Sequence, residues 1–401
     1  MGNISVATSV VGVWTLTLAL VTLTLLPIVR HPAWWVRIWD YPRLQIAAGL
    51  ALALVAQLVL LPMSIFGAVL SLLTIGCLGW QFHRIRPYTF LHRVQVLGDA
   101  KPEPPEEIVL LVANVLQNNR RASDLRRIIR EADPDVVLTL ETNSWWDQQL
   151  EPLLAEYPHA VRHPLENTYG MHLFSRFELQ DAVLHERICK DIPSISVRVR
   201  MRSGSWVNLH CLHPEPPQVD NDTAERDAEL LLVAKEVAED RQPTIVLGDL
   251  NDVAWSRTTR LFQRISGMLD PRVGRGLYST FHAEHWFARW PLDHVFHDPC
   301  FRLTRLKLLP YFGSDHFAVV VGLAYDAAAV QEHEVPEADA EDRQEAAEMI
   351  AEGREAAEQS AVVRPRSALR HDRISENASR ALSPGINDPG TAIDIIGRVV
   401  K

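Results

Sequence analysis

Two long stretches without a charged side chain constrain this chain more than any other feature. Residues 1–28 and 44–82 contain no Asp, Glu, Lys or Arg, although Pro62-Met63-Ser64 interrupts the second stretch. A helix needs about 20 mainly apolar residues to cross a bilayer. The stretches therefore predict three membrane spans, at residues 5–29, 44–61 and 64–82. A cleaved signal peptide is the alternative for the first span, but its basic start and small-residue cleavage site are missing.

The basic residues beside the spans predict their orientation. Arginines follow the first span (Arg30, Arg37, Arg43) and the third (Arg84, Arg86, Arg93), whereas the N-terminal segment and the turn at 62–64 carry none. Because Lys and Arg are enriched in cytoplasmic loops, we expect a multi-pass protein of the cell membrane with the residues after 83 in the cytoplasm. The four cysteines show no CxxC spacing, so we expect neither a disulfide framework nor a zinc site.

Composition divides the chain into four parts. They are a membrane region with three transmembrane helices (1–95), a Pro-rich charged linker (96–106, "VLGDAKPEPPE"), a compact domain (107–325) and an Ala- and Glu-rich tail (326–401). Tyr325 is the last aromatic residue, and the tail has little apolar material to bury, so we expect a solvated helix or disorder there. Within the tail, "RALSPGINDPGTAIDIIGRVV" resembles a short motif in a family of bacterial membrane proteins of unknown function.

The compact domain alternates short strand-like runs with a few helical stretches. Runs such as "EIVLLVANV", "DVVLTLE", "SWVNLHCLH" and "HFAVVVGLAY" are rich in β-branched and apolar residues. Helices are expected around "ASDLRRIIREA", from Trp145 onward, and over "TAERDAELLLVAKEVAED". Many strands with few helices between them predict an α+β domain in which helices cover a two-sheet sandwich.

One strand ends in an unusual polar sequence, "IVLGDLND" at residues 245–252. Side chains two positions apart lie on one face of a strand, so we expect Asp249 and Asn251 to project together and Asp252 to be a turn residue. Polar groups also follow other apolar runs: Asn114, Glu141, His213, Asp293, Asp315 and His316. Each alone could belong to a turn or a helix cap. Together, at the ends of buried strands, they would be costly without a shared task.

The residue types at these strand ends indicate a metal-dependent reaction. Oxygen ligands without cysteine favour Mg²⁺, Mn²⁺ or Ca²⁺ over zinc. Mg²⁺ commonly binds one or two carboxylates together with the phosphate of a substrate. The set therefore predicts phosphoester hydrolysis, in which a carboxylate positions or deprotonates water and a histidine stabilises charge.

The order of these residues resembles the endonuclease/exonuclease/phosphatase superfamily, the DNase-I-like metal-dependent phosphoesterases, over about residues 107–325. "GDLN" followed by "AWS", then "LDHVF" and "SDHFAVV", are similar to its sequence blocks, and "LHPEPP" is similar to a block of its bacterial membrane-anchored members. The resemblance implies a four-layer αββα sandwich. One departure is that Thr139-Leu140 precede Glu141, where a glutamine often precedes the metal-binding Glu.

The resemblance also implies a role for each site residue. Glu141 with Asn114 beside it would hold the divalent cation, Mg²⁺ or alternatively Mn²⁺, and Asp315 would be a ligand of the metal or its water. The catalytic residues would be Asp249 for the attacking water, Asn251 and His213 for the scissile phosphate, and His316 oriented by Asp293 for the transition state. His210 is left outside this set.

The substrate remains open at the level of sequence. The superfamily includes nucleases, inositol-phosphate phosphatases and sphingomyelinases. Residues 104–325 carry 24 Lys and Arg against 31 Asp and Glu, a net charge of −7, whereas a protein that binds duplex DNA usually has a basic face. We expect a membrane-anchored phosphodiester hydrolase of nuclease type, with a phospholipid or inositol-phosphate hydrolase as the alternative and an inactive membrane scaffold as the non-enzyme alternative. The expected partners are a nucleic acid or lipid headgroup and the bilayer, with no protein partner evident.

Overall fold

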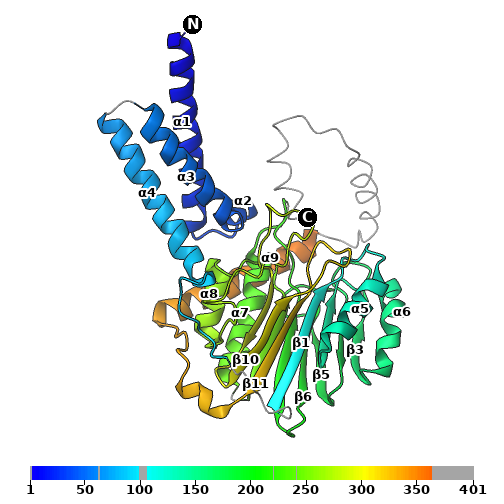
Figure 1. Cartoon of the computed structure of the whole chain (residues 1–401). Coiled ribbons are helices and arrows are strands. Elements are labelled where there is room, and N and C mark those ends of the chain that lie inside the picture. Colours follow the sequence, from blue (N-terminus) through cyan, green and yellow to red (C-terminus); the bar gives the residue numbers. More distant parts are fainter. Residues whose placement is uncertain (1, 62–63, 99–105, 220, 241, 364–401) are drawn as a thin grey trace.

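The computed structural model describes residues 2–61, 64–98, 106–219, 221–240 and 242–363 (Figure 1). Three helices, α1 (Gly2–Leu25), α3 (Arg43–Leu60) and α4 (Ile65–Ile85), pack together and project away from the rest of the molecule. Each is long and apolar enough to cross a membrane, which confirms the three apolar helices predicted from sequence. Short helical segments lie at the base of this bundle: η1 (Leu26–Ile28), α2 (Trp34–Arg37), η2 (Ile38–Asp40) and η3 (Arg86–Tyr88).

Glutamine side chains join the three helices inside the bundle. The Nε2 of Gln57 donates to the Oγ1 of Thr17 at 3.0 Å and to the Oγ1 of Thr74 at 2.9 Å. Closer to the base, the Nε2 of Gln81 donates to the Oγ1 of Thr24 at 3.1 Å. Interhelical hydrogen bonds of this kind contribute roughly 0.6 to 2 kcal/mol each within a membrane, so they help to fix how α1, α3 and α4 pack.

Two mixed sheets form the centre of the remaining structure. The first has the order β10-β11-β1-β2-β4-β3, with β10 (Phe301–Leu308), β11 (Val319–Tyr325), β1 (Glu107–Asn114), β2 (Val136–Leu140), β4 (Met171–Ser175) and β3 (His159–His163). The second has the order β5-β6-β7-β8-β9, with β5 (Leu179–His185), β6 (Ser194–Arg200), β7 (Trp206–Leu212), β8 (Thr244–Asp249) and β9 (Asp293–His297). β1 runs parallel to β2, and β7 runs parallel to β8.

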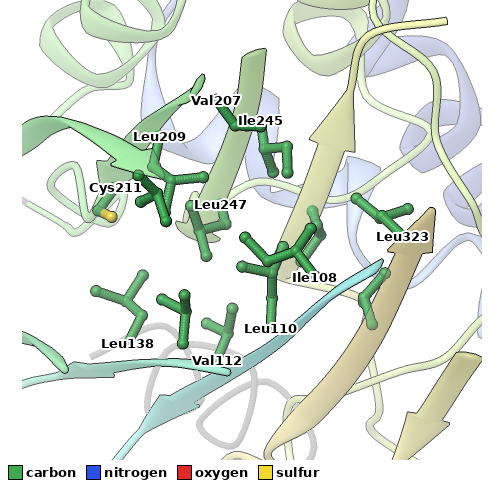
Figure 2. Close-up of a cluster of buried hydrophobic side chains, with 14 of the residues drawn as sticks. Ile108, Leu110, Val112, Leu138, Val207, Leu209, Cys211, Ile245, Leu247 and Leu323 are labelled. Atoms are coloured by element: carbon green, nitrogen blue, oxygen red, sulfur yellow. The ribbon is translucent and has the colours of Figure 1, made fainter. Parts of the chain in front are cut away.

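Alternating residues of the strands build the core between the two sheets. Leu110 of β1 points toward the second sheet, and Leu209 and Leu247 of β7 and β8 point back toward the first (Figure 2). All three side chains are fully buried. Each such side chain stabilises the fold by about 1.5 to 3 kcal/mol when it leaves water, so this layer holds the two sheets face to face.

Helices cover the outer surface of both sheets. α5 (Ala122–Ala132) and α6 (Ser144–Leu150) pack on the first sheet, where Leu125 and Trp146 contact the same cluster as Leu111. α7 (Ala224–Glu239) and α8 (Arg257–Ser266) pack on the second, where Phe262 and Val246 share a cluster. The predicted four-layer αββα sandwich is therefore confirmed. The sequence analysis did not identify α8 or the edge strands β3 and β5. For β5 the reason is that the strand is mostly exposed and has no apolar alternation.

The segments predicted as linker and tail pack on the sandwich where they are described. Val96 is fully buried in the core, and the carbonyl of Leu97 accepts from the N–H of Leu303 at 2.9 Å. After η6 (Ala327–Gln331), helix α9 (Ala340–Val363) lies against α7 and buries Ala346 and Ile350. This part of the tail is therefore a packed helix, where we expected a solvated helix or disorder. The motif at residues 380–400 lies outside the described residues.

Candidate active site

All eight predicted site residues lie at one edge of the sandwich. The parallel strands β1 and β2 end there at Asn114 and Leu140, just before Glu141, and the parallel strands β7 and β8 end there at Leu212 and Asp249. β9 and β11 run antiparallel to their neighbours, so they begin at this edge, where Asp293 and the Asp315-His316 pair lie. The topology thus brings together residues that are up to about 200 positions apart.

Asn114 joins the two sheets through its side-chain amide. Its Nδ2 donates to the Oε1 of Glu141 at 2.9 Å and to the Oδ2 of Asp249 at 3.1 Å. Its Oδ1 accepts from the N–H of Leu116 at 3.0 Å. In this arrangement Asn114 orients the two carboxylates, and its role as a direct metal ligand stays a prediction.

Glu141 lies among groups that favour a bound cation. It follows β2 in a left-handed conformation, with φ 61°, and its Oε2 accepts from the N–H of Gln117 at 3.2 Å. Burial, and then the nearby charge of Asp315, raise the pKa of Glu141 to about 7. Among the described residues, no Lys or Arg forms an ion pair with Glu141, Asp315 or Asp249. A divalent cation would relieve this repulsion, and its preferred ligands are carboxylate oxygens.

His316 and Asp293 form a buried hydrogen-bonded pair. The Nδ1 of His316 lies 2.8 Å from the Oδ2 of Asp293, and its Nε2 lies 3.5 Å from the Oδ2 of Asp249. Burial alone would lower the pKa of His316, but the charges of Asp293 and Asp249 outweigh it and raise the pKa to about 10. The imidazole is therefore cationic at neutral pH. The ring of Phe281, 4.9 Å from that of His316 between centroids, covers one side of it.

His213 is the neutral histidine of the site. Its Nε2 lies 3.9 Å from the Oδ2 of Asp249, but burial outweighs this charge and lowers the pKa of His213 to about 4. Its buried Nδ1 has no hydrogen-bond partner among the described residues. A neutral imidazole carries one donor and one acceptor nitrogen, so His213 can hydrogen-bond a substrate oxygen without adding charge.

Asn251 reaches the site by a turn rather than by strand alternation. β8 ends at Asp249, so Asn251 is not part of the strand. The expectation that strand alternation places both side chains on one face was therefore wrong, although Asn251 does lie at the site. Asn251 has φ 50°, its N–H donates to the Oδ1 of Asp249 at 3.0 Å, and its Nδ2 donates to the carbonyl of Pro214 at 2.9 Å. This Asx-type turn places the amide beside the segment that carries His213.

We call the charged and imidazole side chains at this edge the site cluster: Glu141, Asp249, Asp293, Asp315, His213 and His316. Four carboxylates face one histidine with a raised pKa and one with a lowered pKa, so negative charge is in excess at neutral pH. The buried Oδ1 of Asp293 also has no hydrogen-bond partner among the described residues. Asp249, Asp293 and His316 place ligand-type atoms within 4.8 Å of one another, but His316 and Asp293 are already hydrogen-bonded to each other.

A second buried group lies on the other side of the 249–252 turn. Asp252, expected to be an ordinary turn residue, is 1% exposed. Its Oδ2 accepts from the hydroxyls of Ser256 and Thr259, the latter at 3.1 Å, and its Oδ1 lies 3.7 Å from Arg226. Arg226 also pairs with Asp227 at 2.6 Å. We call this group the junction cluster: Arg37, Asp40, Arg43, Arg226, Asp227 and Asp252.

The junction cluster links the segment between α1 and α3 to the site. Asp40 pairs with both Arg43 and Arg37, and the carbonyl of Asp40 accepts from the Nε1 of Trp255 at 2.7 Å. The hydroxyl of Tyr41 donates to the carbonyl of Asn251 at 2.6 Å, which also accepts from Arg226 at 2.7 Å. The segment between α1 and α3 therefore contacts the backbone of a predicted catalytic residue directly.

Several supporting residues could not be identified from sequence. The hydroxyl of Ser314 donates to the carbonyl of Asn114 at 2.8 Å and accepts from the N–H of His316, and the Oγ1 of Thr280 accepts from the N–H of Asp293. Ser314 is part of the "SDH" block, which was the only available signal; Thr280 had none. His210, left out of the site, has its Nδ1 2.9 Å from the Oγ of Ser196 on the neighbouring strand β6.

Comparison with known proteins gives two family matches. A model described as "Endonuclease/Exonuclease/phosphatase family" matches residues 111–316, just over half of the chain. A second, described as "Predicted membrane protein (DUF2254)", matches residues 324–401, which include the motif noted in the tail. Among curated proteins, none matches the chain.

Solved structures resemble the sandwich at low sequence identity. TDP2 of D. rerio, in complex with a single-strand DNA product, is 18% identical, covers 54% of this chain and 98% of its own, and has a TM-score of 0.47. An endonuclease/exonuclease/phosphatase from Beutenbergia cavernae is 20% identical, covers 55% and 72%, and has a TM-score of 0.44. The human Nocturnin catalytic domain with bound sulfate is 17% identical, covers 60% and 99%, and has a TM-score of 0.44.

Proposed function

Because the chain belongs to the endonuclease/exonuclease/phosphatase family of phosphoester-hydrolysing enzymes, we propose that it is a membrane-anchored, divalent-metal-dependent phosphodiesterase, with Mg²⁺ as the cation and Mn²⁺ as the alternative. The observation that carries this proposal is the site cluster, in which four carboxylates and one cationic histidine meet at the strand ends. A site with excess negative charge binds a phosphate only if a cation accompanies it.

In this proposal Glu141 holds the cation. Asp315 and Asn114 are either further ligands of the cation or groups that orient its ligands. The bound cation would neutralise charge on a phosphoryl oxygen of the substrate. Asp249 accepts the proton of the attacking water. Its position is fixed by the amide of Asn114 and by the N–H of Asn251.

Three donors would surround the phosphate. Neutral His213 donates one hydrogen bond, and the Nδ2 of Asn251 has a second N–H besides the one that reaches Pro214. His316 contributes the positive charge, because Asp293 engages its Nδ1 and leaves its Nε2 on the side of Asp249. Charge that develops on the phosphoryl oxygens is thereby stabilised by groups that are already in position.

We also propose that the three apolar helices anchor the enzyme in the cell membrane with the sandwich on the cytoplasmic side. The support is the position of the six arginines beside the spans. A green fluorescent protein fused after residue 401 should fluoresce in a bacterial host, and an alkaline phosphatase fused there should be inactive. The opposite pair of results would contradict the orientation.

A matched pair of histidines tests the catalytic assignment. His213 and His210 lie on the same chain segment, and burial lowers the pKa of each to about 4. The full chain, purified in detergent, should hydrolyse bis-p-nitrophenyl phosphate with Mg²⁺ and not with excess chelator. His213→Ala should reduce this turnover by about 100-fold or more, as loss of a transition-state donor does, whereas His210→Ala should retain it. Equal turnover in the two variants would contradict the assignment, and no turnover by the wild type would favour the inactive scaffold.

A further inference from the structure

A groove of about 830 Å³ lies between the membrane region and the sandwich. One wall is the start of α3, with Leu44 and Ala48, and another is β10, with Leu306. The third wall is the segment 275–289, which contributes Trp286 and Phe287. The volume falls in the range of small-molecule sites, about 300 to 1,000 Å³, and its apolar lining suits a hydrocarbon chain.

The charged residues of the groove are all basic. Arg275, Arg289 and Lys307 line it, and no acidic residue does. This differs from the surrounding domain, which carries a net charge of −7 over residues 104–325. In the part of the chain that the structure describes, none of the three basic side chains takes part in an ion pair. Arg275 donates to the carbonyls of Pro271 and Val96, and Arg289 donates to that of Ala283. The exposed Lys307 is therefore the most available positive charge beside the apolar surface.

The groove lies beside the start of one of the three candidate membrane spans. Leu44 and Ala48 belong to the first turns of the candidate span Arg43–Leu60. The Nε2 of Gln45, in the same turns, donates to the carbonyl of Phe287 at 2.6 Å. Trp286 is 82% exposed and Phe287 is 48% exposed, which is unusual for such large apolar side chains in water but typical of residues at a membrane interface.

The segment that forms one wall of the groove continues into the candidate active site. Ser279 lines the groove, and two residues later Phe281 covers the ring of His316. The N–H of Ala283 then donates to the carbonyl of Asp315 at 2.6 Å. A molecule held in the groove would thus contact the same loop that shapes the surroundings of His316 and Asp315.

We propose that this groove binds an anionic phospholipid of the bilayer and presents its phosphodiester to the site cluster, so that the substrate class is a membrane phospholipid. The acyl chain lies against Leu44, Ala48 and Trp286, and Arg289 and Lys307 attract the headgroup. The proposed lipid binding is argued from the groove alone, whereas the proposal that this lipid is the substrate rests on the proposed function. In the reaction, water adds its oxygen to phosphorus, a phosphorus–oxygen ester bond breaks, and the leaving alcohol takes up a proton.

Brominated lipid tests the binding. The full chain is placed in phosphatidylcholine nanodiscs with increasing fractions of phosphatidylglycerol brominated on its acyl chains, which quenches nearby tryptophans. The quenching that Trp286→Phe removes reports the groove. Lys307→Glu should raise the lipid fraction needed for half of this quenching by about fivefold or more, since a basic residue near an anionic surface contributes about that factor. Lys235→Glu, the same change at an exposed lysine of α7, should not. Equal behaviour of the two variants, or equal quenching by brominated phosphatidylcholine, would overturn the proposal.

Hydrolysis separates this inference from the proposed function. The wild type should hydrolyse phosphatidylglycerol in the nanodisc, and Lys307→Glu should lower the ratio of phosphatidylglycerol to bis-p-nitrophenyl phosphate turnover. If a single-stranded oligonucleotide is cleaved while phosphatidylglycerol is not, the lipid substrate is wrong and the phosphodiesterase stands. If neither the lipid nor the soluble ester is hydrolysed although the quenching is specific, the proposed function fails and the lipid site stands.

Discussion

The site cluster and the junction cluster lie on opposite sides of the same turn, yet they differ in charge balance. Opposite charges are paired in the junction cluster, whereas negative charge is in excess in the site cluster. In the junction cluster three arginines face three aspartates, and the shortest contacts are those of Arg43 with Asp40 and of Arg226 with Asp227. In the site cluster four carboxylates face a single cationic histidine. One cluster is balanced by the protein itself, and in the proposed function a cation and a phosphate would balance the other.

This difference indicates which residues act on stability and which on catalysis. Removing one partner from a balanced buried ion pair leaves an uncompensated charge, which costs about 3 to 5 kcal/mol. Removing a crowded carboxylate that has no ion-pair partner among the described residues, such as Glu141, relieves repulsion, so it leaves stability unchanged or raises it. Mutations in the two clusters should therefore have separable effects, although Asp249 and Asp252 are only three positions apart.

The largest effect is expected from Glu141→Gln, which removes the proposed cation ligand but preserves its shape. Turnover of bis-p-nitrophenyl phosphate should fall by about 1,000-fold, within the several kcal/mol that a metal supplies to the transition state. A stabilisation of about 2.7 kcal/mol by Mg²⁺ at 100 times its dissociation constant should also disappear. Thermal unfolding with and without Mg²⁺ measures this, and a Mg²⁺ shift that survives in the variant would contradict the assignment.

The next largest effect is expected from Arg226→Met in the junction cluster. Asp227 and Asp252 would lose their partner, so the free energy of unfolding should fall by about 3 to 5 kcal/mol. Denaturant titration of the full chain in detergent measures the loss. Arg264→Met is the matched control, because Arg264 pairs with Asp342 at 2.7 Å at a partly exposed position and should cost far less. Similar losses in the two variants would show that the ion pairs of the junction cluster contribute no more to stability than a partly exposed ion pair.

A smaller, pH-dependent effect is expected for His316 in metal-free protein. Its pKa is raised to about 10 in the folded chain, against about 6.5 when unfolded, so the folded state binds the proton more tightly. The resulting stability is fully present below about pH 6.5 and is lost as the pH rises through about 10. The stability difference between wild type and His316→Asn should shrink over that window. A difference independent of pH would contradict the ion pair with Asp293 and Asp249.

The smallest effect is expected from Tyr41→Phe, which removes the hydroxyl that donates to the carbonyl of Asn251. Arg226 still donates to this carbonyl, so the loss should be about 0.5 to 1.5 kcal/mol, or a few-fold in turnover. Comparing turnover with thermal stability shows whether the hydroxyl positions Asn251. Unchanged turnover would show that the hydroxyl of Tyr41 does not position Asn251 and that Tyr41 contributes only to packing.

The sequence was most informative where local pattern decides structure. The long uncharged stretches predicted the three long apolar helices, and the ends of apolar runs predicted Asn114, Glu141, Asp249 and Asp293 at one sheet edge. It was less informative where structure depends on contacts between distant segments. Nothing near Tyr41 indicates that its hydroxyl reaches a carbonyl 210 positions away.

Asp252 is a second case in which contacts with distant residues, not the local sequence, decide the structure. Its position after "GDLN" is typical of an exposed turn, yet Arg226 and the hydroxyls of Ser256 and Thr259 bury it. In α9, the burial of Ala346 and Ile350 depends on a close approach to α7. At Gly353 an added Cβ would lie 2.3 Å from the Cβ of Ala228, so the glycine permits the approach, which local composition does not reveal.

The most direct test of the two-cluster account is a paired measurement of Asp249→Asn and Asp252→Asn in the full chain. Each variant is assayed for Mg²⁺-dependent turnover of bis-p-nitrophenyl phosphate and for its free energy of unfolding without metal. The account predicts that Asp249→Asn loses about 1,000-fold in turnover, within the range for a general base, and loses less stability than Asp252→Asn, because Asp293 still pairs with His316. It predicts that Asp252→Asn is destabilised by about 3 kcal/mol or more and retains far more turnover per folded molecule. Full turnover in Asp249→Asn, or equal stability in the two variants, would contradict it.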